Sequence, residues 1–151
     1  MTTAIATAAA GFLIAVLWFD LMFDVQSLRS RRSPLVPEPV LASISAYYRR
    51  VTTTASPMGR LVGLVMVILL ADLVAQAATG DVPVWVSAVS LPAALLAIGL
   101  AAVRVFGRAR RLGERADPPE VQSELARSIL RDHVVCLAAM ATLLAVQLTA
   151  V

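Results

Sequence analysis

The stretch LVGLVMVILLADLVAQAA, which occupies Leu61–Ala78, decides the fold class of this chain. Only Asp72 and Gln76 interrupt its apolar run. A helix of about 20 residues, rising 1.5 Å per residue, crosses the ~30 Å hydrocarbon core of a bilayer. The core offers no water to backbone N–H and C=O groups, so a segment that crosses it is helical. The sequence therefore predicts a transmembrane helix over about 57–79.

Three further apolar runs flank this one, at about Ile5–Phe23, Pro83–Val103 and Val134–Val151. Apolar residues occupy every face of these runs, whereas a soluble helix concentrates them in one stripe. Charged residues make up 15% of the chain, against ~25% in soluble domains. We therefore expect an all-α membrane protein with one transmembrane domain over residues 1–151. The expected helices are about 5–27, 57–79, 83–106 and 118–150, the last including a cytoplasmic extension.

The arginines predict the orientation. All thirteen basic residues are Arg, and they lie between the first and second runs or between the third and fourth. The N-terminal tail, the Thr79–Val82 turn and the C-terminus contain none. The positive-inside rule then puts the arginine-rich side in the cytoplasm and predicts a multi-pass membrane protein with both termini outside. The first run has its positive flank after the apolar residues, which favours a retained anchor over a cleaved signal peptide.

The first arginine-rich segment contains a short amphipathic pattern after Pro37–Glu38–Pro39. Apolar residues recur there at helical spacing, which predicts an interfacial helix over about 39–54 that lies among the lipid headgroups. Two interpretations remain open: a helix anchored by its tyrosines, or a surface that recognises anionic headgroups or a partner protein. That surface would comprise Tyr47, Tyr48, Arg49 and Arg50, with Arg108, Arg110 and Arg111 from the second arginine-rich segment.

The second arginine-rich segment is punctuated by Gly107 and Gly113, and we expect it to be a loop. Neither Gly nor Pro occurs from Glu120 to Val151. The fourth helix is therefore expected to begin in the cytoplasm and to enter the membrane without a break.

Ionisable residues at membrane depth are costly, so they are the candidates for function. The candidates are Asp20, Asp24, Asp72, Gln76 and Arg104. Asp20 and Asp24 are four residues apart and share a helix face, as do Asp72 and Gln76. Three interpretations remain open: an ion pair of Asp20 or Asp24 with Arg104, a proton- or cation-coupled carboxylate cluster, or Asp24 reaching the headgroups. Hydrogen bonds between helices are expected from Ser87, Ser90, Thr142 and Gln147.

Catalytic and metal-binding motifs are missing from the sequence. It contains no Gly-rich phosphate loop, nucleophile elbow, HExxH or CxxC motif. The single cysteine, Cys136, excludes an internal disulfide, and the single histidine, His133, excludes a bis-histidine haem from this chain alone. We therefore expect no catalytic residue, no metal site and no cofactor. The arginine-rich segments are short and are separated by a transmembrane helix, which argues against nucleic-acid binding.

Small residues recur four apart on several helices, a spacing that lets helix backbones approach closely. The series include Thr7–Gly11–Ala15, Gly59–Gly63, Ala93–Ala97–Ala101 and Ala141–Ala145. Packing inside a four-helix bundle and packing against another protein both remain open.

Three short motifs carry a resemblance to a group of known proteins. DLMFDVQ at 20–26, YYRRVTT at 47–53 and SPM at 56–58 resemble small bacterial four-helix integral membrane proteins to which no activity is assigned. The resemblance covers the first two transmembrane helices and the segment between them. It implies the four-helix topology and draws attention to Asp20, Asp24 and Gln26.

Two functions follow from these features. The first is a non-enzymatic accessory or stabilising subunit of a larger complex in the bacterial inner membrane, of the lipid-transport or respiratory type, with other integral membrane subunits as partners. The alternative is a small oligomeric carrier or ion-coupled transport protein that uses Asp20, Asp24 and Asp72.

Overall fold

The computed structural model describes residues 2–30, 33–54 and 56–150, and all regular secondary structure within them is helical. The α-helices are α1 (Thr2–Asp24), α2 (Glu38–Arg49), α3 (Ser56–Thr79), α4 (Val84–Leu100), α5 (Phe106–Glu114) and α6 (Pro119–Leu148). Three short segments extend them: a 3-10 turn, η1 (Val25–Ser30), and two π-helical turns, η2 (Arg50–Thr54) and η3 (Ala101–Val105).

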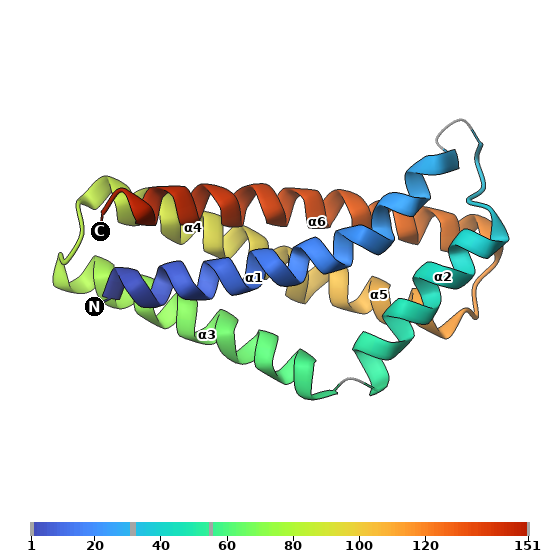
Figure 1. Cartoon of the computed structure of the whole chain (residues 1–151), viewed down its shortest axis with the longest axis horizontal. Coiled ribbons are helices and arrows are strands. Elements are labelled where there is room, and N and C mark those ends of the chain that lie inside the picture. Colours follow the sequence, from blue (N-terminus) through green and yellow to red (C-terminus); the bar gives the residue numbers. More distant parts are fainter. Residues whose placement is uncertain (1, 31–32, 55, 151) are drawn as a thin grey trace.

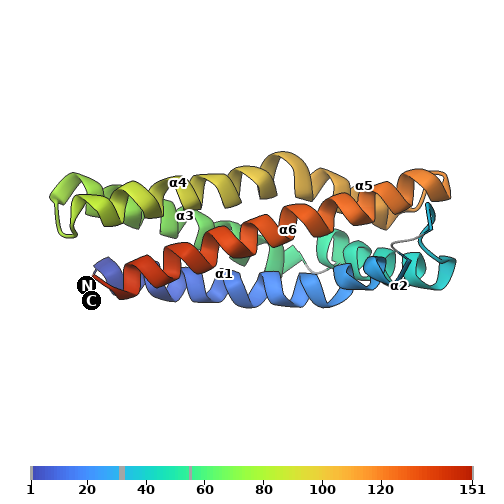
Figure 2. The same cartoon turned by 90° about the horizontal axis from the view of Figure 1, so that it is seen from above.

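Four helical segments are long and apolar enough to cross a membrane: Thr3–Leu28, Pro57–Thr79, Val84–Glu114 and Pro119–Leu148. This confirms the expectation of an all-α chain with four helices able to span a bilayer. They form a bundle in which α1 contacts α3 and α6, and α4 contacts α3 and α6. Both termini lie at one end of the bundle, whereas α2 and α5 lie at the opposite end (Figures 1 and 2).

Large apolar side chains are exposed along most of the bundle, as expected of a surface that faces lipid. They extend along α1 and into η1 from Ile5 to Val25, and along α3 from Met58 to Val74. On α6 they begin only at Val134, and the preceding part of this helix exposes Glu120, Glu124 and Arg131. The first half of α6 therefore lies beyond the apolar surface, at the end of the bundle that contains α2 and α5.

The interior consists of two apolar clusters. The first lies within the four-helix bundle and includes the small residues Ala6, Ala10, Ala94, Ala97 and Ala139. The face of α4 around Ala97 thus packs inside the bundle, where small residues allow close backbone approach, whereas Ala141 and Ala145 of α6 are exposed. The second cluster lies at the opposite end from the termini. It joins α2, α5 and the first half of α6 through Leu41, Ile44, Tyr48, Leu112 and Ile129, among others.

The structure corrects the expected end of the third transmembrane helix. We expected that helix to end near residue 106 and to be followed by a loop, but α4, η3 and α5 form one continuous helical rod to Glu114. Val105, Ala109 and Leu112 are buried at helical spacing against α2, so tertiary packing outweighs the low helix propensity of Gly107 and Gly113. The rod ends at Arg115, which adopts a left-handed conformation with φ 53°.

Gly113 marks the closest approach of α5 to α2. A Cβ atom at this position would lie 2.9 Å from the backbone nitrogen of Arg49 and 3.1 Å from its Cα. We expect Gly113→Ala to destabilise the fold by about 1–3 kcal/mol, because a backbone atom cannot move aside as a side chain does. Gly107→Ala on the same helix is the control, since its Cβ meets nothing within 4 Å. Thermal unfolding in detergent measures both, and equal midpoints would contradict this packing.

Candidate functional site

The most buried ionisable side chain among the described residues is that of Asp24, the last residue of α1. We call the end of the bundle opposite the termini its inner end, and Asp24 lies toward that end. Its exposed fraction is 0%. One carboxylate oxygen accepts a hydrogen bond of 2.5 Å from the Tyr48 hydroxyl, and the other lies 2.6 Å from Nδ1 of His133. Asp24 therefore joins three helices, because Tyr48 belongs to α2 and His133 to α6.

Asp20 occupies the same face of α1 one turn earlier. Its carboxylate accepts a hydrogen bond of 2.6 Å from the Tyr47 hydroxyl, and its second oxygen lies 3.9 Å from Nε2 of His133. The Tyr47 ring stacks on Phe23 of α1, with centroids 4.1 Å apart and planes at 8°. The carboxylates of Asp20 and Asp24 thus face the two nitrogens of one imidazole.

We call Asp20, Asp24, Tyr47, Tyr48 and His133 the inner polar cluster. The sequence had indicated the two carboxylates but neither their tyrosine partners nor the histidine. His133 entered the sequence analysis only as the single histidine that excludes a bis-histidine haem. The described residues contain no group of three or more His, Cys, Asp or Glu side chains placed to hold a metal ion.

The tyrosines had been expected on a surface that binds headgroups, and the structure places them differently. Tyr48 is 2% exposed and Tyr47 is half-buried, with both hydroxyls donating to carboxylates. Burial, and then the negative charges of Asp24 and Asp20, raise the pKa of Tyr48 well above its ordinary value. Its hydroxyl therefore keeps its proton and remains a donor at neutral pH.

Arg104 does not form the ion pair expected for it. Its partner in the structure is Asp132 of α6, with Nε 3.4 Å from Oδ2, rather than Asp20 or Asp24. Asp132 also binds Nη1 of Arg108 at 2.8 Å, and the same guanidinium donates to the hydroxyl of Ser128. These contacts join η3 and α5 to α6 directly beside His133. The predicted ion pair of Arg104 with Asp20 or Asp24 is therefore wrong, because Arg104 pairs with Asp132.

The other arginines of the expected headgroup surface differ in their partners. Arg110 pairs with Glu114 at 3.2 Å, and Arg111 binds Asp117 through two bonds of 2.7 Å. The pKa of Asp117 is lowered, chiefly by the hydrogen bond from Arg111. Arg49 and Arg50 are exposed.

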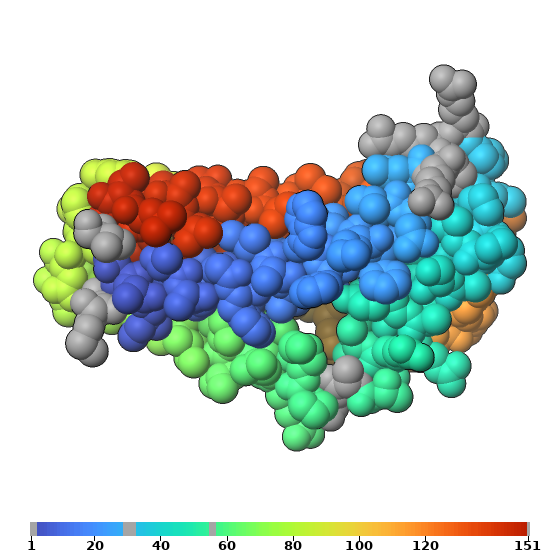
Figure 3. All heavy atoms as spheres, in the orientation of Figure 1, coloured from blue at the N-terminus to red at the C-terminus, as the bar shows by residue number. Residues whose placement is uncertain are grey.

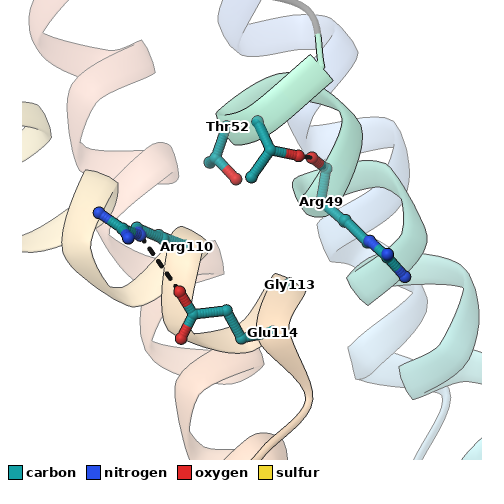
Figure 4. A pocket seen from close by; sticks show the side chains of 6 residues that line it. Arg49, Thr52, Arg110, Gly113 and Glu114 are labelled. Atoms are coloured by element: carbon teal, nitrogen blue, oxygen red, sulfur yellow. Dashed lines mark hydrogen bonds and ion pairs between the residues drawn. The ribbon is translucent and has the colours of Figure 1, made fainter.

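A polar cavity of about 290 Å³ lies between the end of α2 and α5. It is lined by Arg49, Thr52, Thr53, Arg110, Gly113 and Glu114. The Arg49 side chain points away from Arg110, whose guanidinium turns toward Glu114 (Figure 4). The two arginines therefore do not converge on a common ligand position in this cavity.

A second group of buried polar side chains lies near the end of the bundle that contains the termini. We call Asp72, Gln76, Ser90 and Gln147 the outer polar cluster. Nε2 of Gln76 donates to Asp72 at 2.8 Å, and Nε2 of Gln147 lies 3.1 Å from both Oε1 of Gln76 and the hydroxyl of Ser90. The chain of contacts thus joins α3, α6 and α4. Oε1 of Gln147 is buried and has no hydrogen-bond partner within the described residues.

The two clusters are separated by apolar packing. Leu13, Leu69, Ala97, Cys136 and Met140 belong to the core between them. The Cys136 thiol donates to the backbone oxygen of Ala97 at 3.5 Å. Along its length, the bundle interior therefore consists of the inner polar cluster, an apolar middle and the outer polar cluster.

Comparison of the chain with protein-family models, with curated proteins and with solved structures finds no match. The candidate site therefore rests on the geometry of these two clusters.

Proposed function

We propose that the chain is a non-enzymatic accessory or stabilising subunit of a larger inner-membrane complex. The observation that carries this proposal is the unused helix face at the start of α3. Gly59 and Gly63 are both exposed, and a Cβ at either position would meet nothing within 4 Å. Two glycines four residues apart let a second helix approach closely in a bilayer. The Ala93–Ala97 face of α4 is used within the bundle and the Ala141–Ala145 face of α6 is exposed, but the glycine pair permits the closest helix approach and is available to a partner.

The placement of α3 supports the same proposal. In the most apolar 18-residue stretch of α3, only 17% is buried inside the structure, against 39% in the corresponding stretch of α6. Its first turns stand away from α2, and the space-filling view shows an opening between them (Figures 1 and 3). Leu61, Leu64 and Val67 are exposed on this helix. A transmembrane helix from a partner subunit that packs on Gly59 and Gly63 would cover part of this apolar surface.

The orientation is part of the proposal: a bacterial inner membrane, with both termini outside. It is supported by the arginines, which lie between the first and second apolar runs or between the third and fourth; the chain between those runs includes α2 and α5, at the end of the bundle opposite the termini (Figure 1). In this orientation α2 lies at the headgroup level on the cytoplasmic side. Its apolar face packs on α5 and α6, while exposed Arg49 and Arg50 are available to anionic headgroups or to a partner.

The test is the size and composition of the assembly extracted from native membranes in a mild detergent. We expect the wild-type chain in a complex with another integral membrane protein at fixed stoichiometry. The double variant Gly59→Leu with Gly63→Leu should leave that complex, because its side chains block close helix approach. Its unfolding midpoint should stay near that of the wild type, since both positions face open space.

The matched control is Ala141→Leu, a substitution of an exposed small residue on α6. This variant should remain in the complex. A wild-type chain extracted only as a monomer would contradict the proposal. So would a glycine variant that stays bound to the partner.

The second candidate function is a small oligomeric ion-coupled carrier. It is supported by the buried carboxylate of Asp72 in the outer polar cluster. Extraction of the chain as a homo-oligomer would favour this candidate over an accessory subunit.

A further inference from the structure

Asp72 is a buried carboxylate at membrane depth. Its exposed fraction is 9%, and it lies on α3 between Val67 and Val74, both of which expose their side chains on the apolar surface. The amide of Gln76 donates one hydrogen bond to its Oδ2. A neutral amide only partly replaces the hydration of an ionised carboxylate, so a charge in such surroundings needs a compensating positive charge.

The protein supplies no such charge at this level in the described residues. The helices packed on α3 are α1 and α4, and α6 reaches the cluster through Gln147. The sequence of α4 contains no ionisable side chain, and the acids of α1, Asp20 and Asp24, lie near its other end. The ionisable residues of α6 all precede Ala138, while Gln147 lies in its last turn. Within the described residues, Asp72 forms no ion pair.

A second observation points to a bound ligand. Gln147 is 0% exposed, and its Oε1 has no hydrogen-bond partner in the described part of the chain. Its amide nitrogen contacts both Gln76 and Ser90. Buried polar atoms are almost always satisfied, so an unpartnered acceptor in this cluster calls for a donor or a cation.

We infer that the outer polar cluster binds one small monovalent cation, either a proton or an alkali ion, at Asp72. The carboxylate supplies the negative charge, and the oxygens of Gln147 and Ser90 supply neutral ligands or hydrogen-bond acceptors. Oxygen donors are the ligands that hard cations and hydroxonium prefer. The cluster lies near the end of the bundle that holds the termini, so the exchange path to that side is short (Figure 1).

The experiment compares the intact wild-type chain with Asp72→Asn in detergent by thermal unfolding. One titration raises NaCl from low to high concentration at constant ionic strength with choline chloride. A second lowers the pH from 9 to 5 without alkali ions. A ligand that binds only the folded state raises the midpoint with its concentration, by several degrees over about a hundredfold rise above the dissociation constant.

If the cation is an alkali ion, the wild-type midpoint rises with NaCl and that of Asp72→Asn does not. If it is a proton, the wild-type midpoint rises relative to the variant as the pH falls, and NaCl has no effect. Asp81→Asn, at an exposed turn position, is the matched control and should follow the wild type in both titrations. Parallel behaviour of wild type and Asp72→Asn in both titrations would overturn the inference. The result is independent of whether α3 binds a partner.

Discussion

Replacement of Asp24 by alanine is expected to cost about 3–5 kcal/mol of stability, the usual consequence of removing one member of a buried charged pair. The substitution leaves the Tyr48 hydroxyl and the His133 imidazole buried without their acceptor. At roughly 2–4 °C per kcal/mol for a chain of this size, the unfolding midpoint should fall by on the order of 10 °C. Thermal unfolding in detergent, followed by circular dichroism, measures it.

Two further variants separate the contributions to this loss. Asp24→Asn keeps an oxygen that can accept from Tyr48 but removes the charge that faces His133, so its midpoint should lie between those of Asp24→Ala and the wild type. Tyr48→Phe removes one hydrogen bond to a charged group and should cost about 1.5–3 kcal/mol. Asp81→Asn is the surface control and should stay within about 0.5 kcal/mol of the wild type. A midpoint of Asp24→Ala equal to that of the control would show that the inner polar cluster does not hold α1 in place.

The sequence predicted the spans because hydrophobic length alone determines them. Each apolar run can cross a bilayer without reference to the rest of the chain. The helix spacing also placed Asp20 with Asp24 and Asp72 with Gln76, because residues four apart meet on one face of any helix. The hydrogen bond between Gln76 and Asp72 is the local pair that this spacing implies.

The side-chain pairs that join different helices could not be predicted from helix spacing. Tyr47 and Tyr48 follow a segment with three prolines, so the direction of α2 could not be derived from local pattern. Their pairing with Asp20 and Asp24 depends on how α2 packs across the end of α1. One signal was available: Asp24, Arg104 and His133 all lie at the arginine-rich ends of the apolar runs, which places them at one depth. Depth narrows the set of partners, but the order of helices around the bundle selects among them.

The same limit explains the wrong partner assigned to Arg104. Its position at the end of the third apolar run suggested Asp20 or Asp24 as its partner, but Arg104 belongs to the rod of α4, η3 and α5, which packs on α6. Asp132 on α6 is therefore the acid within its reach, at 3.4 Å. The π-helical turn η3 contains Arg104, and Arg108 follows it near the start of α5.

Arg108→Met is expected to destabilise the chain by about 3 kcal/mol, and Arg104→Met by only about 1 kcal/mol or less. The difference follows from geometry and exposure. Arg108 lies 2.8 Å from Asp132 and its side chain is 32% exposed, whereas Arg104 lies 3.4 Å away and is 45% exposed. Loss of Arg108 leaves the buried Asp132 carboxylate with its weaker partner, which costs more than loss of a largely solvated pair. Thermal unfolding of the two single variants measures the order.

A double-mutant cycle then assigns the coupling to a residue pair. Arg108→Met combined with Asp132→Leu should cost less than the sum of the single changes, with an interaction energy of about 1–3 kcal/mol, because neither charge is left buried alone. Arg104→Met combined with Asp24→Asn should be additive within about 0.5 kcal/mol, since Arg104 contacts Asp132 instead. Strong coupling between Arg104 and Asp24, together with additivity at Arg108 and Asp132, would mean that Arg104 anchors α1 after all. The contrast between the two cycles decides which acid neutralises the arginines at the inner end of the bundle.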